Sequence, residues 1–68
     1  MDKSLHNKKD GRIFQMFDGF TGKPMPFREA KHNYTKKDYD MLQVNQAIVF
    51  KPLYGNKNPV YSVLKRIA

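Results

Sequence analysis

Hydrophobic positions along the chain gather in short runs, separated by stretches rich in glycine, proline and charge. The first run, residues 12–17, is rich in aromatic and β-branched side chains and stops at a turn signal beginning with Asp18. Successive side chains of a strand point to opposite faces, so Phe14 and Met16 would share one face of the sheet. We therefore expect a strand at residues 12–17 with both of its faces partly covered.

The clearest pattern is a hairpin near the end of the chain. Two runs rich in Val, Ile, Tyr and Phe, residues 47–54 and 59–67, flank the sequence Gly-Asn-Lys-Asn at residues 55–58. These four residues tolerate positive φ or form Asx turns. We expect an antiparallel hairpin at the structural centre of the domain. Its largely buried side chains would be Ile48, Phe50, Val63 and Ile67.

Proline marks the segment that follows the first strand. Residues 19–27 contain two glycines and two prolines, a composition typical of an irregular hairpin tip. Pro24 and Pro26 cannot donate to a central ladder, so a strand over residues 25–30 would lie at a sheet edge or bulge.

The segment from residue 34 to residue 46 is ambiguous between helix and strand. Thr35 and Asp38 have the spacing of a capping box, which predicts a helix that begins at Lys36. The apolar face of this helix would be poor, so we expect only one or two turns. A strand over residues 36–43 is the alternative.

Residues 1–11 carry a single aliphatic side chain, Leu5, among lysines and aspartates. Such a composition cannot offset the entropy of ordering by burial, so we expect a flexible basic N-terminal arm followed by one domain at residues 12–68. Three to five strands around one short helix predict a mainly β fold, with α+β as the alternative. The expected architecture is a small antiparallel sheet curled into a partial barrel.

Composition excludes several classes of protein. The 68 residues include no cysteine and only two histidines, so we expect no disulfide, metal site or cofactor. The longest apolar stretch is far short of the roughly 20 residues that cross a bilayer. The charged N-terminus lacks the apolar core of a secretory signal, so we expect no membrane association and a cytoplasmic location.

Catalytic chemistry finds little support in the chain. The candidate acids and bases are Asp18, Glu29, Asp38, Asp40 and His32. No nucleophile or partner histidine occurs at a sequence spacing from them that is typical of a catalytic motif. The glycines at 19 and 22 are too close together for a nucleotide phosphate loop, and a proline follows Lys23. We therefore expect a protein that binds a partner and is not an enzyme.

Charge gives the main indication of that partner. The net charge is +7, and most of the excess lies outside residues 1–11. Residues 28–37 hold four permanent cations with a tyrosine among them, a mixture suited to phosphates and unpaired bases. The candidate contacts are Arg28, Lys31, Lys36, Lys37, Lys57, Lys65, Arg66, Tyr34 and Tyr39. Alternatively, the tyrosines turn inward and belong to the core.

Two functions remain open on these grounds. The first is binding of DNA or RNA through the phosphate backbone, although the chain has no helix-turn-helix, zinc-finger or RNA-recognition signature. The second is a small regulator or inhibitor that docks on an acidic surface or sheet edge of a larger protein. Because so small a domain without disulfides has a limited core, we also consider a homodimer.

Overall fold

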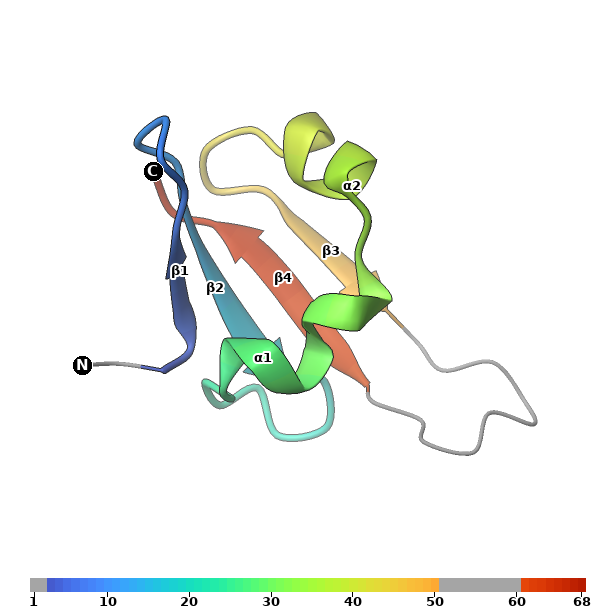
Figure 1. Ribbon diagram of the computed structural model, residues 1–68. Helices are drawn as coiled ribbons and strands as arrows, with labels where there is room; N and C mark the ends of the chain where they lie inside the picture. Colours follow the sequence, from blue (N-terminus) through green and yellow to red (C-terminus); the bar gives the residue numbers. More distant parts are fainter. Residues whose placement is uncertain (1–2, 51–60) are drawn as a thin grey trace.

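The protein is built on an open antiparallel sheet of four strands (Figure 1), and the computed structural model describes residues 3–50 and 61–68. The strands are β1 (Leu5–Asn7), β2 (Ile13–Asp18), β3 (Ala47–Phe50) and β4 (Ser62–Arg66). Their order in the sheet is β1-β2-β4-β3, with every neighbouring pair antiparallel. The mainly β prediction is confirmed. The partial barrel is not, because β1 and β3 form two separate edges of the sheet.

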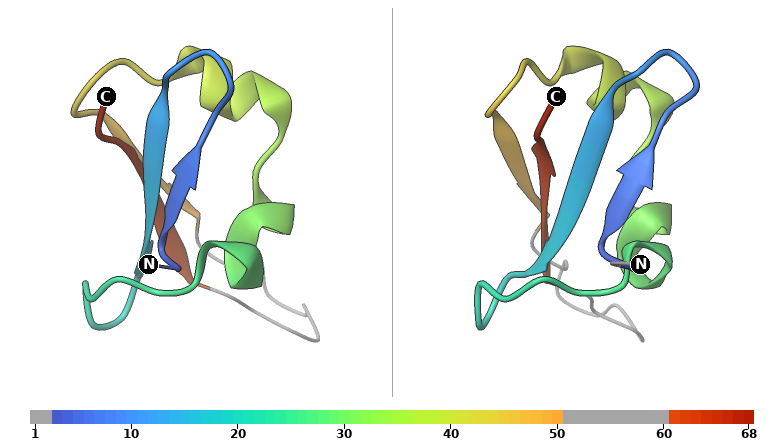
Figure 2. Two further views of the ribbon diagram at one scale, coloured as in Figure 1. Left: turned by 60° about the vertical axis from the view of Figure 1, so that its left-hand side comes forward. Right: turned by 90° about the vertical axis from the view of Figure 1, so that its left-hand side faces the viewer.

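The helical segments all lie between β2 and β3 in the chain. They are α1 (Phe27–Ala30), the 3-10 turn η1 (Lys31–Asn33) and α2 (Lys36–Met41). Figure 2 shows them on one side of the sheet, while no described helix covers the other side. None of the helices in the described ranges is long and apolar enough to cross a membrane. The core lies between sheet and helices and comprises Phe14, Met16, Phe27, Ala30, Tyr34, Tyr39, Leu42 and Leu64.

Each of the three predicted apolar runs contains a strand. Phe14 and Met16 of β2 are fully buried on the side of the helices. β3 and β4 pair as an antiparallel hairpin in which Val49 lies opposite Val63. The predicted turn at residues 55–58, with Lys57, lies outside the described residues.

The expected burial along the hairpin is partly wrong. Ser62 and Leu64 of β4 are fully buried, whereas Val63 is only half-buried and Ile67 is exposed. The reason is strand alternation, since the even-numbered side chains of β4 are the ones that face the helices. Ile48 and Phe50 of β3 pack against the core but remain partly exposed, because β3 lies at the edge. The centre of the sheet is the pair β2 and β4.

The prediction of a flexible arm is wrong at Leu5–Asn7, which forms β1 and pairs with β2. Backbone hydrogen bonds tie the preceding residues down as well, because Met16 donates its N–H to the Ser4 carbonyl at 2.9 Å. Ser4 is buried in consequence. The order comes from main-chain pairing with the edge of β2, which side-chain composition does not encode.

The prediction of an edge strand at residues 25–30 is also wrong, because Phe27–Ala30 forms α1. Pro24 still pairs with Phe17 in an isolated bridge, but the extended backbone ends at Pro26. Pro26 is the N-cap of α1, where its missing N–H removes no hydrogen bond from the helix. Phe27 and Ala30 lie on the buried side of α1, so packing on the sheet stabilises this single turn.

The predicted short helix is confirmed as α2, which begins at Lys36. The Thr35 N–H donates to Oδ2 of Asp38 at 2.7 Å, completing the expected capping box. Leu42, directly after the helix, is buried in the core.

Candidate anion-binding site

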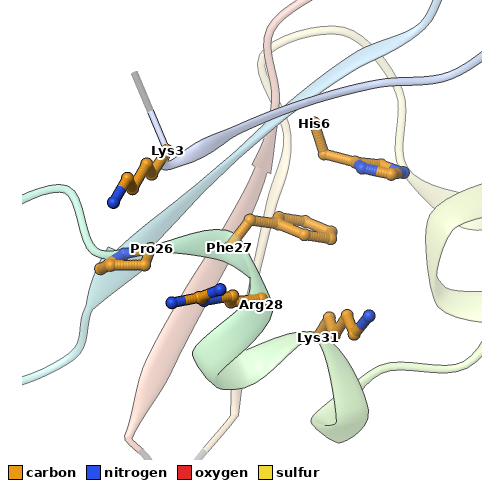
Figure 3. Close-up of a pocket in the computed structure, with 6 residues that line it drawn as sticks. All are labelled: Lys3, His6, Pro26, Phe27, Arg28 and Lys31. Atoms are coloured by element: carbon orange, nitrogen blue, oxygen red, sulfur yellow. The ribbon is translucent and has the colours of Figure 1, made fainter. Parts of the chain in front are cut away.

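A surface pocket of about 410 Å³ lies between β1 and α1. Figure 3 shows the six residues that line it: Lys3, His6, Pro26, Phe27, Arg28 and Lys31. They come from two stretches of chain that are far apart in the sequence. The pocket therefore exists only because β1 docks beside the helical segment.

Main-chain contacts hold the two sides of the pocket together. Phe27 donates its N–H to the carbonyl of Lys3 at 2.8 Å, which joins the start of α1 to the residues before β1. The Ser4 carbonyl accepts a bond from β2, so the same short segment is fixed on both sides. The backbones that carry Lys3 and Arg28 are thereby placed next to each other.

An aromatic pair forms the wall behind the cations. His6 lies opposite Phe14 in the β1–β2 ladder, and its ring stacks on Phe27 with centroids 4.4 Å apart and planes 6° from parallel. Burial lowers the pKa of His6, and the nearby ammonium groups of Lys8 and Lys31 lower it further. The imidazole is therefore mainly neutral at pH 7 and acts as a flat, uncharged surface.

The rim of the pocket is strongly positive. Lys3, Arg28 and Lys31 are exposed and have no hydrogen bond or ion pair with another described side chain. The ion pairs found among the described residues are those of Arg12 with Asp10 and Asp40. Glu29, the one acidic residue of α1, is exposed and does not line the pocket. Three permanent cations thus line a concavity whose lining contains no carboxylate.

The predicted basic residues are divided among several places in the fold. Arg28 and Lys31 line the pocket, and Lys36 and Lys37 are exposed at the start of α2, on the same side of the sheet. Lys65 alternates with the buried Leu64 and so points to the face without helices. Lys57 lies outside the described ranges.

Arg66 is occupied by the fold itself. Its Nη1 donates to the carbonyl of Leu42 at 3.0 Å, and its Nε donates to the carbonyl of Ala68 at 3.0 Å. The bond to Leu42 joins the end of α2 to the end of β4. Arg66 is therefore poorly placed to contact a phosphate.

The two tyrosines belong to the core, so the prediction that their rings are exposed for stacking is wrong. Tyr34 and Tyr39 are only 7% and 8% exposed. The Tyr34 hydroxyl lies 3.0 Å from Oγ of Ser62, and the Tyr39 ring packs edge-on against Phe14. Burial raises the pKa of both phenols. The alternative, in which these aromatic rings turn inward, holds for both.

Of the six residues that line the pocket, only Arg28 and Lys31 were predicted as contacts from the sequence, and Lys3 and His6 are the polar ones that were missed. Both lie in a segment whose composition indicated an arm, and the strand that orders them is three residues long. A three-residue alternation is too short to separate from chance. No cluster of three or more potential metal ligands occurs in the described part of the chain.

Comparison with known proteins gives no assignment, because no family model, curated protein or solved structure matches the chain.

Proposed function

We propose that the protein binds nucleic acid through the phosphate backbone, using the basic side of the molecule that carries the helices. The contacts on this side are Lys3, Arg28, Lys31, Lys36 and Lys37. The observation that carries the proposal is the pocket between β1 and α1, which is lined by three cations that have no ion-pair partner among the described residues and by no carboxylate.

Phosphate chemistry explains why this arrangement favours a nucleic acid. Each phosphodiester carries one negative charge, and cations that neutralise it release condensed counterions into the solvent. Contacts to phosphate carry little sequence information. Binding by this surface should therefore depend strongly on salt and weakly on base sequence.

The test is a fluorescence anisotropy titration with labelled single-stranded and duplex oligonucleotides at two salt concentrations. If about four phosphates of a duplex are neutralised, raising the salt from about 50 to about 200 mM weakens binding roughly 150-fold. Replacing Lys36 and Lys37 together by glutamine should make the slope of log affinity against log salt concentration shallower. The change should correspond to the loss of up to about two phosphate contacts.

The matched control is the double variant Lys9→Gln/Lys23→Gln, which removes the same charge from exposed loops outside the helical segment. Its slope should stay closer to that of the parent protein. Failure of every oligonucleotide to bind more tightly than about 100 μM at the lower salt would overturn the proposal, because that is the weak end of non-specific affinity.

A protein partner is the second candidate, and it is favoured by the face of the sheet without helices. Val49 on β3 is 52% exposed and Leu5 on β1 is 39% exposed, and both point to this face, as does the half-buried Val63. Apolar side chains on an uncovered sheet suit a docking protein or a second copy of the chain.

Affinity purification with and without nuclease separates the two functions. If the protein binds nucleic acid, the nucleic acid captured with it should disappear after nuclease treatment. It should also be missing when the Lys36→Gln/Lys37→Gln variant is used as the bait. If the protein is a regulator, a partner protein should be captured whether or not nuclease is added. The Val49→Asp variant should fail to capture this partner, since the new charge opposes apolar docking.

A further inference from the structure

We propose that the pocket between β1 and α1 receives the terminal phosphate of a nucleic-acid strand, a phosphomonoester, while the lysines of α2 contact phosphates further along the strand. This inference rests on the proposed function and deepens it, because it separates recognition of a strand end from contact with a running backbone. Its elements are a concave site, three cations in the lining and an apolar wall.

The first step is the shape and charge of the pocket. Its volume of about 410 Å³ falls within the range of about 300 to 1,000 Å³ usual for small-molecule sites. Its cations come from three places in the chain: Lys3 before β1, Arg28 in α1 and Lys31 in η1. A phosphomonoester carries about −1.5 to −2 charges at neutral pH, more than a phosphodiester, so it gains more from a site lined by several cations.

The second step is the chemistry of the individual cations. Arg28 offers a planar fork that bonds two phosphate oxygens at once, whereas Lys3 and Lys31 act as mobile point charges. Neither the Arg28 nor the Lys31 side chain forms a hydrogen bond or ion pair with another described residue. These donors are therefore available to a ligand without breaking any described contact.

The third step is the wall. The rings of Pro26 and Phe27 make the apolar part of the lining, and His6 covers Phe27 as an uncharged ring. A sugar attached to the phosphate can rest on such a surface, which free inorganic phosphate would leave unused. A nucleic-acid strand is favoured over a phosphorylated protein because Lys36 and Lys37 lie on the same side of the sheet and match a further series of phosphates.

The experiment compares three forms of one short single-stranded oligonucleotide: with a 5′-phosphate, with a 3′-phosphate and with hydroxyls at both ends. One phosphorylated form should bind about tenfold more tightly than the hydroxyl form, the effect of one strong additional contact. Adenosine monophosphate, added as a competitor, should abolish the difference in affinity between the phosphorylated and the hydroxyl forms, while adenosine should not.

Two variants assign the effect to the pocket. Arg28→Gln should abolish the preference for the phosphorylated end. Lys37→Gln removes an equal charge from outside the pocket, so it should weaken all three forms similarly and preserve the preference. Both positions are exposed, and melting temperatures measured alongside verify that the variants are folded.

The outcomes distinguish this inference from the function on which it rests. Equal affinity for all three forms, with the salt-dependent binding intact, would overturn end recognition and leave backbone binding in place. Absence of binding by every form would overturn both. Tighter binding of a serine-phosphorylated peptide than of the phosphorylated oligonucleotide would overturn the choice of ligand.

Discussion

At the scale of single residues, the buried hydroxyl of Tyr34 shows how the fold uses a polar group that the sequence suggested for binding. It lies 3.0 Å from Oγ of Ser62 and donates to the Ser62 carbonyl at 3.2 Å, in a buried setting. Tyr34→Phe should lower the free energy of unfolding by about 1–2 kcal/mol, because it leaves these groups of the fully buried Ser62 without that partner. Urea denaturation measures the change.

The double variant Tyr34→Phe/Ser62→Ala provides the control. It removes the unpaired hydroxyl along with its partner, so it should be more stable than the sum of the single changes predicts. Unchanged stability of Tyr34→Phe would contradict a structural role for the hydroxyl.

His6 gives a prediction about pH. Its pKa lies below the ordinary value of 6.5, because burial and the charges of Lys8 and Lys31 disfavour the imidazolium. The folded state therefore prefers the neutral ring more strongly than the unfolded chain does. The resulting stability should be fully present above about pH 6.5 and be lost as the pH falls through the lowered pKa.

An NMR titration of the His6 ring protons checks this directly. Lys31→Gln should raise the His6 pKa, since it removes one of the repelling charges. Lys36→Gln is the matched control and should leave that pKa nearly unchanged, because Lys36 is not one of the charges that lower it. A His6 pKa above 6.5 in the parent protein would contradict the predicted sign.

At the scale of elements, β1 decides whether the pocket exists. Deleting residues 1–10 would remove the pairing with β2 and the bond from Phe27 to the Lys3 carbonyl. We expect the melting temperature to fall by more than about 8 °C, which corresponds to over 1 kcal/mol for a domain of this size. Thermal denaturation followed by circular dichroism measures it.

Lys3→Gln is the control for that deletion, because the bond to α1 uses the main chain of Lys3 and survives the substitution. Its melting temperature should not fall below that of the parent. A truncated protein that melts like the parent would show that β1 contributes little to the fold.

The elements also show what could be predicted from the sequence. β2, β3 and β4 come from apolar runs long enough to display alternation, and α2 is marked by the side chains of Thr35 and Asp38. β1 and α1 are three and four residues long and depend on backbone pairing and on packing against the sheet, so local pattern cannot specify them. The site divides in the same way. Arg28 and Lys31 follow from cation density, whereas Lys3 and His6 join them only through the docking of β1.

At the scale of the whole molecule, the charges fall into two groups with different roles. Arg12 forms ion pairs with Asp10 and Asp40, which join the β1–β2 turn to α2. Lys3, Arg28 and Lys31 have no such partner among the described residues, although the fold brings them to one pocket. With a net charge of +7, this gathering of like charges opposes compaction of the chain.

That repulsion predicts opposite effects for two arginines. At low salt, Arg28→Gln should raise the melting temperature by a few degrees, since glutamine has a similar helix propensity and the change mainly removes a repelling charge. Arg12→Gln should lower it, because two carboxylates lose their partner. Thermal denaturation at about 20 and about 200 mM sodium chloride tests both. Added salt should stabilise the parent more than the Arg28 variant, because screening weakens a repulsion that the variant has already lost. A variant at position 28 that melts below the parent at both salts would show that Arg28 supports the fold. Stabilisation together with a lost preference for a phosphorylated strand end would instead mark it as a residue kept for binding at a cost to stability.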